Sequence, residues 1–309
     1  MKHLLNTRTY KPLLLFLLLT TGLLKAQEQE FTVLNYNALH GFRGDSLLEQ
    51  RYIDWVKELA PDVVAYQEMN GYTQNDIGDL GDSYGHPYAV IMNTEYGVPV
   101  THPLAITSKY PILNVERVMD NMWHGYLYAR IEGVHVFVTH LAPFTLKDRQ
   151  EDIRKILAQI ELLPKDEKVL LMGDLNSLSP QDSTAYGQDL EEAMQRSEGK
   201  FITKSNTPIL RNRTIYRQNL NNGKIDYSVI QAILDAGFKD SYYLKNDSFR
   251  NSVPTSGHAK KTSKLRRIDY IWVDEELTSD LKAAEILQNE TTHELSDHYP
   301  VLVKFSFQK

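Results

Sequence analysis

The sequence of 309 residues contains no cysteine. Disulfide bonds are therefore excluded, although exported proteins commonly use them. A bacterial lipoprotein anchor is excluded as well, because no cysteine follows the apolar N-terminal stretch. The folded state must be stabilised by its packed core alone.

The sequence also lacks an apolar run long enough to span a bilayer, which takes about 20 residues. The most apolar stretch runs only from Leu13 to Leu24. Basic residues precede it (Lys2, Arg8 and Lys11) and the small residue Ala26 follows it, which is the pattern of a secretory signal peptide. The alternative is a buried N-terminal helix, but no polar face interrupts the leucines. We expect residues 1–26 to be a signal peptide cleaved after Ala26, and the protein to be secreted or periplasmic.

No internal repeat, low-complexity linker or sharp change of composition follows residue 30. We therefore expect one domain over residues 27–309. The stretch from about 180 to 224 is polar and weakly patterned. We interpret it as a surface excursion of that domain that shapes a substrate pocket.

The chain has 42% hydrophobic and 24% charged residues, which is ordinary for a soluble globular protein. Residues 1–26 carry four basic residues and no acidic one, so their removal would change the formal charge from −6 to −10. A negative total charge disfavours non-specific binding of nucleic acid. One local exception is a basic run consisting of Lys260, Lys261, Lys264, Arg266 and Arg267. It is either a solvated loop or a phosphate-binding segment.

Strand and helix patterns alternate through the first half of the chain. Residues 31–38 alternate as a strand does, and residues 46–59 carry one apolar stripe at helical spacing, ended by Pro61. Further strands are expected at 63–66, 88–92, 102–107, 126–131, 134–139, 169–172, 268–273 and 300–307. Helices are expected after Thr145 and at 228–236. Because strands also pair locally as hairpins, the mixture favours layered sheets covered by helices over a purely parallel sheet.

Six polar clusters stand where these strands end or begin. A single acid or histidine at such a position is usually a turn residue or a helix cap, but six in one chain indicate an active site. The clusters are Asn35-Tyr36-Asn37, Gln67-Glu68, Thr139-His140, Gly173-Asp174-Leu175-Asn176, Arg267-Ile268-Asp269-Tyr270 and Ser296-Asp297-His298-Tyr299-Pro300.

In this order the clusters resemble the endonuclease/exonuclease/phosphatase family, which includes pancreatic deoxyribonuclease, abasic-site endonucleases and bacterial sphingomyelinases. Thr107-Ser108-Lys109-Tyr110-Pro111-Ile112 is similar to another segment of that family. The resemblance covers nearly the whole chain after residue 30. It implies an α/β fold of the deoxyribonuclease I type, a four-layered α/β/β/α sandwich of two packed mixed sheets flanked by helices, with the site at one edge.

Hydrolysis of a phosphoester requires neutralisation of the phosphoryl oxygens while water attacks in line with the leaving oxygen. Mg²⁺ supplies this charge and binds one or two carboxylates plus water and substrate oxygens. We expect Glu68 to be the first metal ligand, with Asn37 and Asp297 as further ligands. Mn²⁺ or Ca²⁺ are alternatives to Mg²⁺. Each of the three residues also has a structural interpretation, as a turn residue, a helix cap or a salt-bridge partner.

Attacking water must lose a proton, for which His298 is the expected base, oriented by Asp269. Asp226 stands in a second Ile-Asp-Tyr triplet, but it is better placed to cap the helix near residue 228. Asp174 is expected to position the water and Asn176 to contact a phosphoryl oxygen. His140 is expected to stabilise the phosphoryl group or to protonate the leaving oxygen. The other histidines are taken as surface or structural residues: His40, His86, His102, His124, His135, His258 and His293. Of these, His124 and His258 are the first to test.

One position departs from the abasic-site endonucleases, which carry an acid two residues after the first-strand asparagine; here it is Leu39. There is also no aromatic-rich basic ribbon for binding single strands. The sequence thus predicts an exported Mg²⁺-dependent phosphoesterase whose substrate is a small molecule or lipid headgroup rather than a polynucleotide. A secreted deoxyribonuclease-like endonuclease and an inactive binding protein on the same scaffold are the alternatives. Nothing indicates an obligate protein partner.

Overall fold

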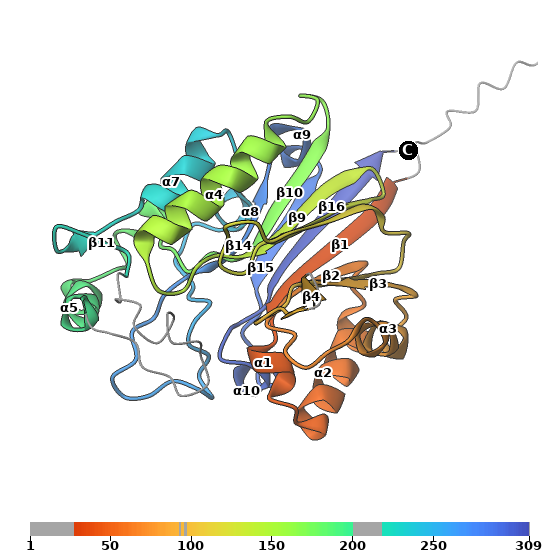
Figure 1. Ribbon diagram of the computed structural model, residues 1–309, viewed down its shortest axis with the longest axis horizontal. Coiled ribbons are helices and arrows are strands. Elements are labelled where there is room, and N and C mark those ends of the chain that lie inside the picture. Colours follow the sequence, from red (N-terminus) through yellow and green to blue (C-terminus); the bar gives the residue numbers. More distant parts are fainter. Residues whose placement is uncertain (1–27, 93, 96–97, 200–217, 309) are drawn as a thin grey trace, which may run out of the picture.

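The computed structural model describes residues 28–92, 94–95, 98–199 and 218–308, and Figure 1 shows two sheets with helices on their outer faces. The first sheet has six strands in the order β15-β16-β1-β2-β6-β3. Their bounds are β1 Glu28–Asn37, β2 Val63–Gln67, β3 Tyr88–Ile91, β6 Ala105–Ser108, β15 Leu281–Ile286 and β16 Val301–Gln308. β1 pairs parallel with β2 and antiparallel with β16.

The second sheet also has six strands, in the order β13-β14-β10-β9-β8-β7. Their bounds are β7 Leu113–Val118, β8 Tyr126–Ile131, β9 Val134–His140, β10 Lys168–Asp174, β13 Lys239–Asp240 and β14 Asp269–Val273. β10 pairs parallel with β9 and antiparallel with β14. Two short hairpins lie outside the sheets: β4 Thr94–Glu95 with β5 Val98–Pro99, and β11 Leu220–Asn221 with β12 Lys224–Ile225.

The helices connect the strands or cover the sheets. The longer ones are α2 Ser46–Leu59, α3 Gln74–Ser83, α4 Leu146–Ile160, α5 Gln188–Ser197 and α7 Ser228–Asp235. The shorter ones are α1 Leu39–Phe42, η1 Pro180–Asp182, α8 Ser241–Lys245, α9 Glu275–Thr278 and α10 Thr292–Leu295. No helix within the described ranges is long and apolar enough to cross a membrane.

The central core lies between the two sheets. Alternate residues of β1 and β16, such as Val33 and Val303, pack there against alternate residues of β9 and β10, such as Val136 and Leu170. This is the side-chain alternation that two face-to-face sheets require. Continuous apolar runs such as 169–172 arise because the opposite face of each sheet is buried too.

Two outer cores complete the layers. On the first sheet, Tyr52, Trp55 and Val56 of α2 pack with α3 against residues that include Leu34 and Tyr66. On the second sheet, α4 and α7 cover another set, which includes Phe137, Leu171 and Trp272. The predicted four-layered α/β/β/α sandwich is confirmed.

Local predictions differ from the structure where the apolar pattern is weak. The helix 46–59 has the predicted bounds, because its stripe is complete and Asp45 caps it. The strand expected at 102–107 begins only at Ala105, because His102 has a φ of 59° and cannot extend a strand. The excursion at 180–224 contains α5, and residues 200–217 of it lie outside the described residues, as does the expected signal peptide 1–26.

Candidate active site

Strand register brings the polar clusters to one edge of the sandwich. In the second sheet, Asp174 at the end of β10 pairs with His140 at the end of β9 and with Asp269 at the start of β14. In the first sheet, Asn37 ends β1 beside Gln67, which ends β2. β16 runs antiparallel to β1, so the segment before Val301 also reaches this edge.

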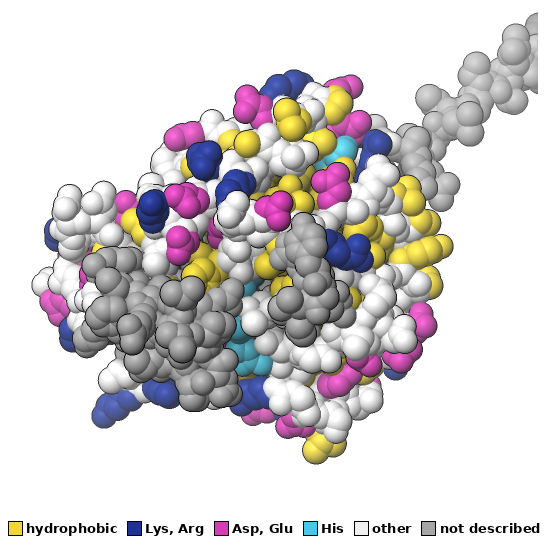
Figure 2. Space-filling view, in the orientation of Figure 1, with side chains coloured by type: hydrophobic (Ala, Val, Ile, Leu, Met, Phe, Trp, Pro, Cys, Tyr) yellow, Lys and Arg dark blue, Asp and Glu magenta, His cyan; other side chains and the backbone are white. Residues whose placement is uncertain are grey.

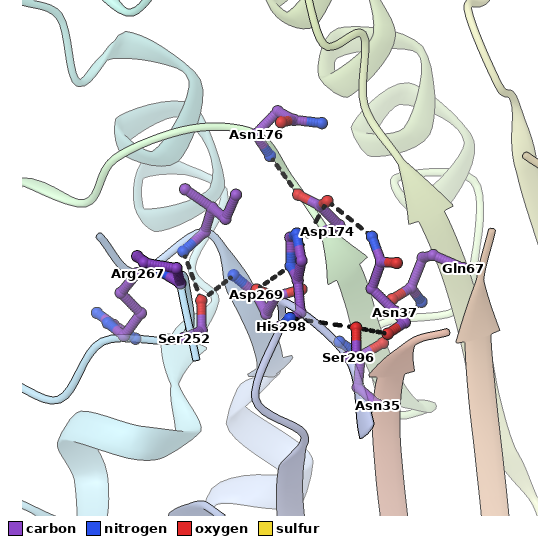
Figure 3. A network of polar contacts seen from close by, with 12 residues as sticks. Asn35, Asn37, Gln67, Asp174, Asn176, Ser252, Arg267, Asp269, Ser296 and His298 are labelled. Atoms are coloured by element: carbon purple, nitrogen blue, oxygen red, sulfur yellow. Dashed lines mark hydrogen bonds and ion pairs between the residues drawn. The ribbon is translucent and has the colours of Figure 1, made fainter. Parts of the chain in front are cut away.

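Asp269 and His298 form a buried pair at the centre of the site (Figure 3). His298 Nδ1 lies 2.9 Å from Asp269 Oδ2 and 3.9 Å from Asp174 Oδ2. Burial alone would lower the pKa of His298, but the carboxylates of Asp269 and Asp174 raise it well above the usual value. Burial raises the pKa of Asp269, and the facing His298 opposes that rise. The imidazole is therefore held in one orientation and is a stronger base than in water.

Two serines hold this pair in place. The backbone N–H groups of Ile268 and Asp269 donate to Ser252 Oγ, at 3.0 and 3.1 Å. Ser296 Oγ donates to the carbonyl of Asn37 and accepts the N–H of His298. Ser296 was part of a predicted cluster, whereas no pattern in the sequence pointed to Ser252. Both link segments that are far apart in the chain.

Asn37 connects the two halves of the site. Its Nδ2 donates to Glu68 Oε1 and to Asp174 Oδ2, each at 3.2 Å, and its Oδ1 accepts the N–H of Leu39. As placed, the amide bridges two carboxylates and directs its donor group toward them. Its role as a metal ligand stays a prediction.

The segments after β9 and β10 contact each other through Asn176. This residue has a φ of 48°, donates its N–H to Asp174 Oδ1 at 2.9 Å and donates Nδ2 to the carbonyl of Leu141 at 3.1 Å. An amide nitrogen carries two hydrogens, so one remains for a ligand. His140 is buried, and its Nε2 lies 3.4 Å from Asp174 Oδ2. Both residues can therefore face a phosphoryl group beside Asp174.

Glu68 lies among histidines that sequence reasoning had assigned to the surface or to structural roles. His40 Nδ1 is 3.2 Å from Glu68 Oε2, and potential ligand atoms of His40, Glu68 and His102 all lie within 4.8 Å of one another. Burial alone would raise the pKa of Glu68, but the neighbouring histidines, His140 first among them, lower it to about 2. Figure 2 shows histidine side chains gathered near the centre of this face. His40 lies three residues after the end of β1 and His102 three residues before the start of β6, so neither stood in a predicted strand-end cluster.

His124, which the sequence marked for testing, is buried in this edge. Its ring centroid is 4.3 Å from that of His140 and 5.0 Å from that of His102. His102 in turn lies 5.1 Å from His40. The His102 ring centroid is also 6.1 Å from that of His140, so the four rings form one cluster that extends from exposed His40 to His140 beside Asp174.

Asp297 borders a pocket of about 400 Å³. The pocket is lined partly by the stretch expected to shape it, through Met194 and Gln218, and partly by later residues that include His258 and Arg266. Asp297 Oδ1 is buried and accepts no hydrogen bond from the described residues. A larger cavity of about 740 Å³ lies between α4 and α7 and touches none of the site residues.

The basic run at 260–267 is only partly a surface feature. Arg267 is buried: its Nε is 2.9 Å from Asp182 Oδ2 and its Nη1 is 2.6 Å from Asp240 Oδ2. The interpretation of Arg267 as part of a phosphate-binding patch is therefore wrong, because its charge is neutralised inside the protein. Lys264 pairs with Asp189 at 2.7 Å. Asp226, in the second Ile-Asp-Tyr triplet, accepts the N–H of Ser228 at the start of α7.

The donor set at this edge fits a divalent cation. Glu68 is ionised at any physiological pH, and Asp297 has an open carboxylate oxygen. Carboxylate oxygens are ligands that hard divalent cations bind. Asp174, Asp269 and His298 also bring ligand atoms within 4.8 Å of one another, but Asp269 and His298 direct theirs at each other.

Comparison with known proteins identifies a matching family model and solved structures of similar fold. The model of the endonuclease/exonuclease/phosphatase family matches residues 34–298. The fold is similar to that of an AP endonuclease from Archaeoglobus fulgidus, with a TM-score of 0.62, 16% identity, and coverage of 89% of this chain and 99% of that one. It is also similar to a 3′-5′ exonuclease from Neisseria meningitidis, with a TM-score of 0.62, 17% identity, and coverage of 90% and 100%. No curated protein sequence matches the chain significantly.

These structures share the fold at low sequence identity, whereas the family model spans most of the chain and includes the strand-end clusters from Asn35 to His298. The chain therefore belongs to the endonuclease/exonuclease/phosphatase family and is a phosphoester-hydrolysing enzyme.

Proposed function

We propose that the protein is an exported, divalent-metal-dependent phosphoesterase that hydrolyses a small phosphodiester or phosphomonoester by in-line attack of water. The observation that carries this proposal is the Asp269–His298 pair beside Asp174, with His140 also beside Asp174. A base, its orienting carboxylate and a second imidazole thus meet around one carboxylate.

In this proposal His298 takes the proton from the attacking water, and Asp269 holds the imidazole and stabilises its charged form. Asp174 accepts a hydrogen bond from the same water and fixes its direction of attack. Asn176 donates from its amide to a phosphoryl oxygen. His140, held beside Asp174, donates to the phosphoryl group or to the leaving oxygen.

A cation at Glu68 would neutralise charge on the phosphoryl oxygens. Glu68 would hold it, with Asp297 and Asn37 as further ligands, and Mg²⁺ is the cation that such an oxygen set favours. Mn²⁺ and Ca²⁺ are the alternatives within the same set.

The pocket beside Asp297 supports a small substrate. Its volume of about 400 Å³ and the positively charged Arg266 in its lining suit a compact anion. Arg267 is buried in ion pairs and Lys264 is held by Asp189, so a long cationic track for a polynucleotide has little support. The negative formal charge of the chain agrees with this.

A substrate panel tests the proposal. Purified residues 27–309 should hydrolyse a chromogenic phosphodiester, phosphomonoester or lipid-headgroup phosphoester, lose that activity in EDTA and regain it when a divalent cation is added. Nicking of supercoiled plasmid with no turnover of small esters would instead favour the endonuclease. Absence of cation-dependent turnover of any substrate would contradict both.

Export is tested separately from catalysis. If residues 1–26 direct secretion, the mature protein should appear outside the cytoplasm with Gln27 as its first residue, as read by N-terminal sequencing. A full-length protein that stays in the cytoplasm would refute export and leave the enzymatic proposal standing.

A further inference from the structure

Two histidines stand beside Glu68 because of the topology of the first sheet. β1 and β2 are parallel and β6 is antiparallel to β2, so the ends of β1 and β2 and the start of β6 share one edge. His40 follows β1, Glu68 follows β2 and His102 precedes β6. The three side chains thus come from segments that adjoin three neighbouring strands.

The spacing of their ligand atoms suits a single cation. Donors that share a cation at bond lengths of about 2.1 Å lie roughly 3 to 4 Å apart. His40 Nδ1 is 3.2 Å from Glu68 Oε2, and the three residues bring ligand atoms within 4.8 Å of one another. A simple ion pair accounts for His40 and Glu68 alone, but not for the arrival of His102 at the same place.

The backbone at all three positions is unusual for residues with side chains. His40, Glu68 and His102 have φ values of 53°, 62° and 59°, in the left-handed region that such residues rarely adopt. Strain of this kind persists only where the surrounding structure imposes it, and it is concentrated at functional sites. Here the N–H of Gly41 donates to the carbonyl of Glu68 at 2.6 Å, which fastens the His40 segment to the Glu68 segment.

The group can be reached from solvent. The Glu68 side chain is 14% exposed and that of His40 is 52% exposed, so a cation can enter. The His102 ring contacts the rings of His124 and His140, so a cation held here would lie on the catalytic edge.

We propose that His40 and His102 join Glu68 as ligands, forming a two-histidine, one-carboxylate site that binds a first-row transition cation in preference to Mg²⁺. Imidazole nitrogens suit zinc and iron, whereas Mg²⁺ keeps oxygen ligands and its own waters. This inference rests on the proposed function and changes the cation expected for it. It assigns a role in selecting the metal to two histidines outside the predicted clusters.

Calorimetric titration of EDTA-stripped protein tests the site without reference to activity. Zn²⁺ and Mg²⁺ are added in separate experiments, and Zn²⁺ should bind at least about 100-fold more tightly. Titration with Co²⁺ gives a second readout, because imidazole ligation should produce visible d–d absorption bands in the wild type.

Variants then assign the ligands. His40→Ala and His102→Ala should each weaken Zn²⁺ binding about 10-fold or more and change Mg²⁺ binding less than threefold, and the Co²⁺ bands should diminish. His135→Ala is the matched control: it lies on β9 five residues before His140, roughly 17 Å away along the strand. Its Zn²⁺ affinity should equal that of the wild type.

His102→Asp distinguishes loss of a metal ligand from misfolding of the variant. The aspartate replaces an imidazole by a carboxylate, so it should lower the ratio of Zn²⁺ to Mg²⁺ affinity while cation binding is retained. Circular dichroism should show the same fold in every variant that is compared.

Unchanged Zn²⁺ affinity in both His40→Ala and His102→Ala would overturn the inference, as would equal losses for Zn²⁺ and Mg²⁺. Zn²⁺ binding that disappears in Asp269→Asn but not in His102→Ala would move the site to the Asp174–Asp269–His298 group and also overturn it. Phosphoesterase activity with Mg²⁺ alone would leave the proposed function intact. Tight Zn²⁺ binding through His40 and His102 without any hydrolysis would support the metal site and contradict the proposed function.

Discussion

At the scale of single residues, the identity of the partner of His298 is the clearest feature of the site. The chain contains two Ile-Asp-Tyr triplets with similar local sequence. Only Asp269 reaches His298, because β14 starts opposite the end of β10, whereas Asp226 bonds to the first turn of α7. Strand register, not the triplet itself, therefore selects the functional aspartate.

Replacement of Asp269 by asparagine should lower kcat by on the order of 10²-fold or more, because the amide cannot stabilise the charged imidazole or hold its tautomer. The measurement is steady-state hydrolysis of the best substrate from the panel. Asp226→Asn is the control with the same change in the other triplet, and it should keep kcat within about twofold. Equal losses in the two variants would refute the role assigned to Asp269.

At the scale of elements, the close approach of β9 and β10 positions Asp174 next to His140. Gly173 precedes Asp174 with a φ of 147°, and a Cβ atom there would lie 1.8 Å from the carbonyl oxygen of Thr139. Only glycine permits this contact, which explains the first residue of the Gly-Asp-Leu-Asn cluster.

Gly173→Ala should therefore destabilise the protein by about 3 kcal/mol or more and displace Asp174 from His140. Chemical denaturation gives the free energy of unfolding, and the same sample gives the activity. Gly78→Ala is the comparison, because Gly78 lies inside α3 with open space around its Cβ position and should be neutral or stabilising. Wild-type stability of Gly173→Ala would show that β9 and β10 can move apart at little cost, and it would contradict the requirement for glycine at this position.

The helix α4 positions the segment after His140. The N–H of Ala142 donates to Asp152 and its carbonyl accepts from Arg149, so both backbone groups are bound to the helix. Burial raises the pKa of Asp152 to about 6, above the value near 4 in an unfolded chain.

The raised pKa predicts a pH dependence of stability. Between pH 4 and 6 the folded state binds more protons at Asp152 than the unfolded state, so this residue makes stability fall as the pH rises through that window. Asp152→Asn should remove this contribution, which is at most about 3 kcal/mol. Free energies of unfolding at pH 4, 5, 6 and 7 measure it. A variant curve parallel to that of the wild type would contradict the prediction.

Much of the element pattern was predictable because burial enforces it. The stripe of α2 and the apolar runs of β9 and β10 follow from packing on one face or on both. Among the longer elements, four were missed: α3 contains two glycines, α5 buries only Leu190 and Met194, and both β7 and β15 are edge strands. Their local sequence is weak, and tertiary contacts decide their structure.

The candidate site also has one part that the sequence predicted and one part that it did not. The strand-end clusters were visible in the sequence, whereas the approach of His40 and His102 to Glu68 depends on left-handed backbone at isolated positions. No periodic pattern encodes such conformations. The burial of Arg267 was equally hidden, because its partners Asp182 and Asp240 are distant in sequence.

At the scale of the whole molecule, one core joins the two sheets. Residues of β1, β2 and β16 pack in a single cluster with residues of β8, β9 and β10. The catalytic edge combines His298, before β16 of the first sheet, with Asp174 and Asp269 of the second. Separation of the sheets would therefore abolish both the core and the site.

Residues 27–309 should accordingly unfold in one cooperative transition. In differential scanning calorimetry the calorimetric and van't Hoff enthalpies should agree, as for a two-state domain. Activity should be lost over the same temperature range. Two resolved transitions, with activity lost in the first, would show that the sheets are separate units and would contradict the expectation of one domain.

The central claim is that His298 at this edge serves as the base in cation-dependent phosphoester hydrolysis. The most direct test is the initial rate on the best substrate of the panel, for the wild type and His298→Ala, each in EDTA and after re-addition of the cation. The cation should restore full activity only in the wild type, and His298→Ala should be slower by on the order of 10²-fold or more with an unchanged fold. Wild-type rates in His298→Ala, or rates that EDTA does not affect, would contradict it.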